Sequence, residues 1–169
     1  MRRRHALMAA ALPLAGCTPA AVDGFATLAD AQRAVEALRR GWRSRAGWDL
    51  PQTLQHLAQS IEYSLRGFPQ PYSAAFQATA GKAAFAWFES RGRMSHSLTE
   101  PIPGAPALAA GVPIDAAVDR LLAALRAFEG HAGPLAPHFA YGALDKPAYA
   151  RAHLMHLANH WSEFEEIRT

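Results

Sequence analysis

The residues of this sequence best suited to chemistry are histidines close to its C-terminal end. His156 and His160 are four positions apart, so in a helix their side chains would lie above one another on adjacent turns. Two imidazoles at this spacing can bind one metal ion, as in helical zinc sites. A chain with eight histidines also forms such a pair by chance, and the two rings would then satisfy polar groups at the margin of a core. The pair alone favours neither interpretation.

His56 supplies a third nitrogen from an earlier part of the chain. It lies on a polar strip that borders the apolar face of a helical pattern. Two helices with histidines at such margins could supply three ligands and leave a coordination position for water or substrate. We therefore expect a divalent metal ion bound by His56, His156 and His160, with zinc, nickel, iron and manganese as candidates.

Other polar residues are expected to support this site. His153 lies one turn before His156 on the same stripe, where a fourth ligand would crowd His160, so we place it in the pocket beside the ligands. His138 falls in a predicted loop and either lines the pocket or caps the last helix. The remaining candidates for the pocket are Tyr63, Tyr149 and Glu163, of which Glu163 is the nearest candidate for a general base.

Five helical patterns would position these residues. Apolar residues recur at three- and four-residue spacing over residues 28–41, 49–66, 73–89, 115–129 and 145–167. Thr27, Asp49 and Asp145 are suited to cap three of these helices at their N-termini. On the last helix, an apolar face that ends with Trp161 and Phe164 borders the stripe of histidines.

The patterns predict an all-α fold in one domain. Residues 94–113 contain four prolines and are expected to form a long surface connection. His96 in this connection and His131 in the break at residues 130–137 are given no role. No strand-like alternation competes with the helices. The simplest architecture is a four-helix bundle with an additional helix or a long crossover.

The basic composition of the chain does not indicate a nucleic-acid partner. Lys and Arg number 17 and Asp and Glu number 14, but residues 2–4 are all arginine and no acidic residue precedes Asp23. Without residues 1–16, 17 − 3 = 14 basic side chains balance 14 acidic ones. A neutral domain has no general attraction for phosphate backbones, so we expect no binding to nucleic acid.

The N-terminus has the pattern of a lipoprotein-type signal peptide over residues 1–16. Three arginines precede a short apolar stretch, and the sequence Leu-Ala-Gly before Cys17 resembles a bacterial lipobox. An ordinary cleaved signal peptide is the alternative, and the arginines also resemble a twin-arginine export signal. We expect lipidation at Cys17, which is the only cysteine. Residues 17–26 would then be a tether and residues 27–169 the domain, exported and anchored to the membrane on the periplasmic side.

Three segments together resemble a known family. They are WDLPQTLQHLAQSIEYSL (48–65), HFAYGAL (138–144) and HLMHLANH (153–160). In order and spacing they are similar to domain-of-unknown-function family 1569, within the DinB-like (YfiT-like) metalloprotein superfamily. The resemblance implies a DinB-like four-helix bundle in which His56, His156 and His160 bind a divalent ion. It also implies kinship with thiol-dependent transferases and isomerases.

Two functions follow from these observations. The first is a metal-dependent transferase or hydrolase that acts on a small molecule outside the cytoplasm. The second is a non-catalytic lipoprotein in which the metal stabilises the fold or a binding surface. Export counts against simple transfer of the family's thiol chemistry, because an intracellular thiol is harder to supply there.

Overall fold

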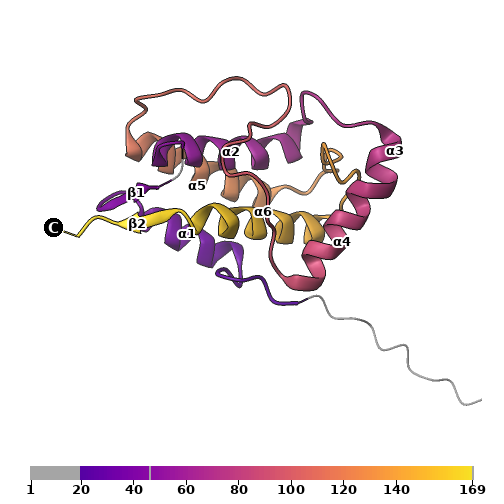
Figure 1. The fold of residues 1–169 in the computed structure, drawn as a ribbon, viewed down its shortest axis with the longest axis horizontal. Helices are drawn as coiled ribbons and strands as arrows, with labels where there is room; N and C mark the ends of the chain where they lie inside the picture. Colours follow the sequence, from indigo (N-terminus) through magenta and orange to yellow (C-terminus); the bar gives the residue numbers. More distant parts are fainter. Residues whose placement is uncertain (1–19, 46, 169) are drawn as a thin grey trace, which may run out of the picture.

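The computed structural model describes residues 20–45 and 47–168, and this part of the chain is mostly helical. The predicted signal peptide and Cys17 lie outside the described residues. Within the described residues, no helix has the length and apolar character needed to cross a membrane. The elements in chain order are α1 (Leu28–Ala37), β1 (Trp42–Ser44), α2 (Leu50–Arg66), α3 (Ala74–Phe76), the π-helical turn η1 (Gln77–Gly81), α4 (Lys82–Arg91), α5 (Ile114–Gly130), α6 (Lys146–Trp161) and β2 (Phe164–Glu166) (Figure 1).

Three helices, α1, α2 and α6, begin where the predicted caps place them. The Thr27 side chain accepts a hydrogen bond from the backbone of Asp30 at the start of α1. Asp49 and Gln52 form the predicted capping box of α2, each side chain accepting from the backbone N–H of the other. The Asp145 side chain does the same for α6 by accepting from Ala148. These contacts satisfy backbone donors that would otherwise lack a partner.

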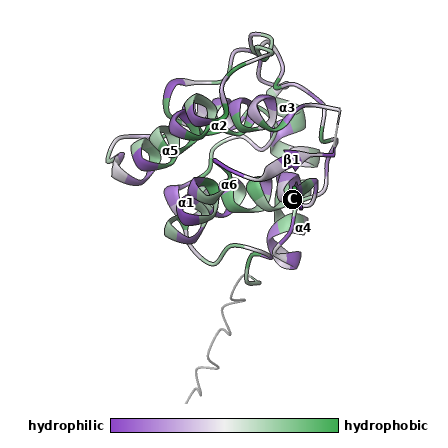
Figure 2. Ribbon diagram, turned by 90° about the vertical axis from the view of Figure 1, so that its left-hand side faces the viewer, coloured by the Kyte–Doolittle hydropathy of each residue, from purple (hydrophilic) through white to green (hydrophobic). Residues whose placement is uncertain are grey.

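The apolar faces of four helices meet in one core. α2 packs against α5 and α6, and α1 packs against the same two helices. Hydrophobic and hydrophilic residues occupy different faces of these helices (Figure 2). The largest fully buried apolar side chains come from all four helices: Val35, Leu54, Leu57, Ile61, Leu121, Leu125, Phe128, Tyr149, Met155 and Leu157. Burial of this surface is the main stabilising contribution to the arrangement.

The last predicted helix is too long and the expectation of no strands is wrong. α6 ends at Trp161, and Phe164–Glu166 pairs antiparallel with Trp42–Ser44. This pairing provides hydrogen-bond partners for backbone N–H and C=O groups of both segments. Phe164 stays buried, with 8% of its surface exposed. The first helix also ends early, at Ala37, and Gly41 then turns the chain into β1 with a φ of 76°.

The third predicted helix is interrupted by a π-helical turn. The Ser73 side chain caps the N-terminus of α3. The residues of α3, η1 and α4 are consecutive, so the chain stays helical and only its hydrogen-bonding pattern changes at η1. At the end of η1, Gly81 lies against the loop of residues 138–142. A Cβ at this position would be 1.9 Å from the carbonyl oxygen of Ala140, so only glycine allows this close approach.

The described part of the expected tether packs against the domain. Phe25 is 5% exposed and contacts Trp161 edge-on. The backbone N–H of Asp23 donates to the carbonyl of Gly92, and Arg151 donates to the carbonyl of Ala20. The packed part of the chain therefore extends to residues before 27.

The long connection between α4 and α5 has no helix or strand, as predicted, but it is held against α2. The side-chain amide of Gln55 exchanges two hydrogen bonds with the backbone of Ala109, and Gln59 donates to the carbonyl of Pro106. Ile102 in the connection is 5% exposed. The polar residues of α2 thus fix an irregular segment over the helices that carry the histidines (Figure 1).

Candidate metal centre

Two helices bring the three predicted ligands together. His56 lies in the buried middle part of α2, and His156 and His160 lie on adjacent turns of α6. Their exposed fractions are 3%, 9% and 1%, respectively. The imidazoles meet because α2 packs against α6 in the core, which places the polar margins of the two helices side by side.

The spacing of the three rings fits a shared metal ion. One nitrogen from each of His56, His156 and His160 lies within 4.8 Å of the other two. The Nε2 atoms of His56 and His156 are 3.2 Å apart. Nitrogen ligands about 2.0–2.1 Å from a tetrahedral zinc ion lie roughly 3.3–3.4 Å from one another. The cluster could therefore hold an ion with small adjustments of the side chains.

Two ring nitrogens in this cluster are buried without a partner. His56 Nδ1 and His160 Nε2 form no hydrogen bond within the described part of the chain. An unpaired polar atom in a protein interior costs about 1–3 kcal/mol. A metal ion bound by His160 through Nε2 would remove one of these costs, which is the behaviour expected of a ligand and not of a structural histidine.

Burial keeps the three rings neutral, as metal ligation requires. Loss of hydration lowers the pKa of His56 to about 4 and that of His160 to about 3. The pKa of His156 is also lowered by burial, and repulsion from its histidine neighbours adds to the effect. Each ring therefore carries a free lone pair at neutral pH.

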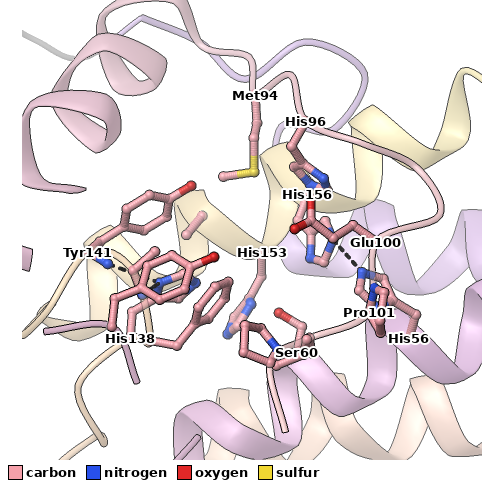
Figure 3. A pocket seen from close by; sticks show the side chains of 16 residues that line it. His56, Ser60, Met94, His96, Glu100, Pro101, His138, Tyr141, His153 and His156 are labelled. Atoms are coloured by element: carbon pink, nitrogen blue, oxygen red, sulfur yellow. Dashed lines mark hydrogen bonds between the residues drawn. The ribbon is translucent and has the colours of Figure 1, made fainter. Parts of the chain in front are cut away.

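A pocket of about 210 Å³ adjoins the cluster. His56 and His156 form part of its wall, and His138 and Tyr141 lie on the opposite side (Figure 3). The remaining lining residues are mostly apolar or come from the connection between α4 and α5: Ser60, Tyr72, Met94, His96, Glu100, Pro101, Ile102, Pro103, Phe139, Ala140, Ala152 and His153. A small molecule in this pocket would contact two of the three candidate ligands.

His96 lines this pocket as well, although no sequence pattern assigns it a role. Its ring centroid is 4.9 Å from that of His156 and 5.6 Å from that of His160. Its Nδ1 atom is 2.7 Å from the carbonyl oxygen of Ser97, so Nδ1 carries the proton in the neutral ring and Nε2 has the lone pair. An irregular segment has no periodicity that would indicate a facing direction, and the Gln55 and Gln59 contacts that fix it are not evident from the sequence.

Of the residues predicted to support the site, His153 and His138 line the pocket, whereas Tyr149 and Tyr63 do not. His153 lines the pocket, with its Nε2 atom 3.3 Å from the Ser64 hydroxyl, and His138 lines it too. Tyr149 lies in the core and donates its hydroxyl hydrogen to the carbonyl of Ala136. Tyr63 packs against Phe68.

Glu163 does not line the pocket either. It follows the end of α6, and its backbone carbonyl accepts from the backbone N–H of Arg45 beside the strand pair. No carboxylate from the histidine helices therefore reaches the pocket. The carboxylate that does line it is Glu100, from the connection.

The buried histidines predict acid-sensitive folding. Burial lowers the pKa of His153 and of His138 to about 3 in the folded protein. Between that value and about 6.5 the unfolded chain binds more protons, so stability falls as pH falls, by about 1.4 kcal/mol per pH unit for each such histidine. Urea unfolding of the metal-free protein at about pH 7 and about pH 5 would measure this loss. His153→Gln, which can still bond to Ser64, should show a shallower dependence, and an equal slope would contradict the assignment.

The chain matches a known protein family. The sequence model of the family described as "Protein of unknown function (DUF1569)" matches residues 23–167. No curated protein and no solved structure matches the chain.

Proposed function

Because the chain belongs to the DUF1569 family, whose description assigns no function, we propose one from the site itself. The domain binds one divalent metal ion through His56, His156 and His160, and it uses this ion to act on a small molecule in the adjoining pocket. The observation that carries the proposal is the convergence of three buried, neutral imidazoles, one nitrogen of each within 4.8 Å of the others, beside a pocket.

The residues of the pocket suit a reaction with limited access of water. A divalent ion at the cluster would polarise an electrophile and lower the pKa of a thiol or water beside it. Met94 and Ile102 cover the pocket with apolar surface, which strengthens polar interactions inside it. Ser60 and His153 add hydrogen-bonding groups to its wall. We therefore favour a metal-dependent transferase or hydrolase.

A non-catalytic role is the second candidate. His160 is 1% exposed and does not line the pocket, and the three ligands connect α2 with α6. A metal ion there would cross-link two helices of the core and stabilise the fold by mass action. This role needs no open coordination position.

Cobalt spectroscopy distinguishes the two candidates. Protein loaded with Co(II) has a visible spectrum that reports on its ligands, and 2-mercaptoethanol serves as the probe. With an open position, the thiol will bind and produce a thiolate-to-cobalt charge-transfer band. A spectrum that does not change at saturating thiol indicates a site closed by protein ligands and would exclude the catalytic proposal. His131→Ala, which changes a histidine outside the cluster, should respond as wild type does.

We extend the proposal to the architecture and the location of the domain. The contacts of α2 and α1 with both α5 and α6, together with the three-histidine cluster, support a DinB-like four-helix bundle. The pattern of residues 1–17 supports an exported lipoprotein anchored through Cys17 on the periplasmic side. Palmitate labelling of the full chain that persists in Cys17→Ala would refute the anchor.

A further inference from the structure

The ring of His138 is locked inside a tight loop at the end of the pocket opposite the metal cluster. Its Nδ1 atom accepts hydrogen bonds from the backbone N–H groups of Ala140 and Tyr141, at 3.1 and 3.2 Å. Its own backbone exchanges two hydrogen bonds with Gly142, and its ring stacks on Tyr141 with centroids 4.2 Å apart and planes at 7°. The orientation of this ring is therefore fixed by the protein before any ligand arrives.

These contacts also fix the tautomer. A backbone N–H can only donate, so Nδ1 of His138 must hold a lone pair, and the single proton of the neutral ring lies on Nε2. Burial keeps the ring neutral by lowering its pKa to about 3, with smaller contributions from His153 and His96. His138 is thus a neutral hydrogen-bond donor throughout the physiological pH range.

The donor has no acceptor within the described residues. No described side chain or carbonyl accepts a hydrogen bond from His138 Nε2, although the residue is only 8% exposed and lines the pocket. Figure 3 shows the ring across the pocket from His56 and His156. Nε2 of His138 is not among the fully buried unpaired atoms of the described residues, so it opens onto the pocket, where a ligand can supply the acceptor in place of water.

The His138 end of the pocket favours an acceptor without charge. No Lys or Arg is among the residues that line the pocket, and both the histidine cluster and Glu100 lie across it from His138 (Figure 3). Apolar groups from Met94, Ile102 and Phe139 cover much of the remaining wall. A carboxylate or phosphate at the His138 end would lose its hydration and gain only one hydrogen bond from a neutral donor. A carbonyl oxygen carries no charge, so a single hydrogen bond from this donor is enough to offset its loss of water.

We propose that the Nε2–H of His138 binds the carbonyl oxygen of a small, uncharged ketone, amide or ester and positions it in the pocket shared with the three-histidine cluster. This inference rests on the proposed function for its second half, the proximity of the substrate to a metal ion. The first half, carbonyl recognition by His138, stands on the geometry of the loop and the lining of the pocket.

Two substitutions separate ligand binding from loop structure. In His138→Asn the side-chain oxygen replaces Nδ1 as the acceptor for Ala140 and Tyr141, but the Nε2–H donor is lost. In His138→Gln an amide N–H group can reach the position of Nε2, but the acceptor inside the loop is lost. If His138 only held the loop, Asn would behave as wild type in every assay and Gln would differ only in stability.

The test is an NMR titration of full-length protein with cyclopentanone as the probe, and with cyclopentane and cyclopentanecarboxylate as matched controls. Ring ¹⁵N shifts should show the Nε2–H tautomer of His138, and cyclopentanone should shift this signal and bind more tightly than either control. His138→Asn should weaken cyclopentanone binding about threefold to tenfold, the usual worth of one neutral hydrogen bond, and His138→Gln should retain more of it.

Several results would overturn the inference: an Nδ1–H tautomer, no binding of cyclopentanone to wild type, tighter binding of the carboxylate at the His138 signal, or unchanged cyclopentanone affinity in His138→Asn. Elemental analysis of the same samples, and the same titration with His160→Ala, separate this result from the metal proposal. Wild-type protein that retains no metal after incubation with excess metal, yet still binds cyclopentanone at His138, would refute the proposed function and leave the recognition by His138 intact.

Discussion

Replacing His160 with alanine will abolish stoichiometric metal binding. The cluster offers three protein nitrogens, and removing one leaves only the pair of His56 and His156. Loss of a hydrogen bond that merely supports a ligand typically costs about 10–100-fold in metal affinity, and loss of a ligand will cost more. Competition with a chromophoric chelator measures this affinity directly.

The thermal melt provides a second measure of the same change. In wild type, metal at about 100 times its Kd should stabilise the fold by about 2.7 kcal/mol, because the ion binds the folded chain. In His160→Ala this increment should disappear. The difference between loaded and metal-free melts is the quantity to compare, because the substitution also removes packing around a residue that is 1% exposed.

Matched histidine variants provide the controls. His131 lies outside the cluster, where its Nε2 atom contacts the carbonyl of Pro134, so His131→Ala should keep wild-type affinity. His153→Gln should keep most of it, since His153 bonds to Ser64 and is not among the three converging rings. Undiminished metal binding by His160→Ala would exclude the proposed ligand set.

Replacing Gly81 with alanine will destabilise the fold by about 3 kcal/mol or more, the upper part of the range for overpacked sites. The new Cβ would lie 1.9 Å from the carbonyl oxygen and 3.0 Å from the carbonyl carbon of Ala140. Both are backbone atoms, so no side-chain rotation relieves the clash. Either η1 or the loop of residues 138–142 must shift, and the shift would disturb the hydrogen bonds from Gln77 to the carbonyls of His138 and Phe139.

Destabilisation by a Gly→Ala substitution within a helix would indicate a steric clash, because the usual effect has the opposite sign. In an open helix position, alanine is more favourable than glycine by up to about 1 kcal/mol. Gly130→Ala at the end of α5 is the matched control, because nothing lies within 4 Å of its added Cβ. Urea unfolding of both variants should show a loss for Gly81→Ala and little change or a gain for Gly130→Ala. Equal stability of the two variants would mean that η1 does not pack on the loop as described.

The sequence predicted the elements whose signals are local. The caps at Thr27, Asp49 and Asp145 depend on side chains within three residues of the helix start, and all three are present. The strand pair was not predicted because its two segments have three residues each and lie far apart in the chain. Its register depends on tertiary packing around Phe164, which no local pattern reveals.

In the candidate site, too, the residues with a local sequence signal were predictable and those placed by tertiary contacts were not. Helical periodicity indicated that His56, His156 and His160 share polar margins, and the packing of α2 on α6 brings them together. Glu163 was placed near the site only because α6 was expected to continue past Trp161. His96 was missed because its position depends on an irregular segment fixed by side-chain-to-backbone hydrogen bonds from α2.

In our proposal, His56, His156 and His160 together bind one divalent ion. Elemental analysis and X-ray absorption measure the metal content and the ligands of protein purified without a histidine tag, after incubation with metal and removal of the excess. We expect about one metal ion per chain, with imidazole nitrogens at roughly 2.0–2.1 Å for zinc. A protein that retains no metal, or a triple alanine variant that retains as much as wild type, would contradict the claim.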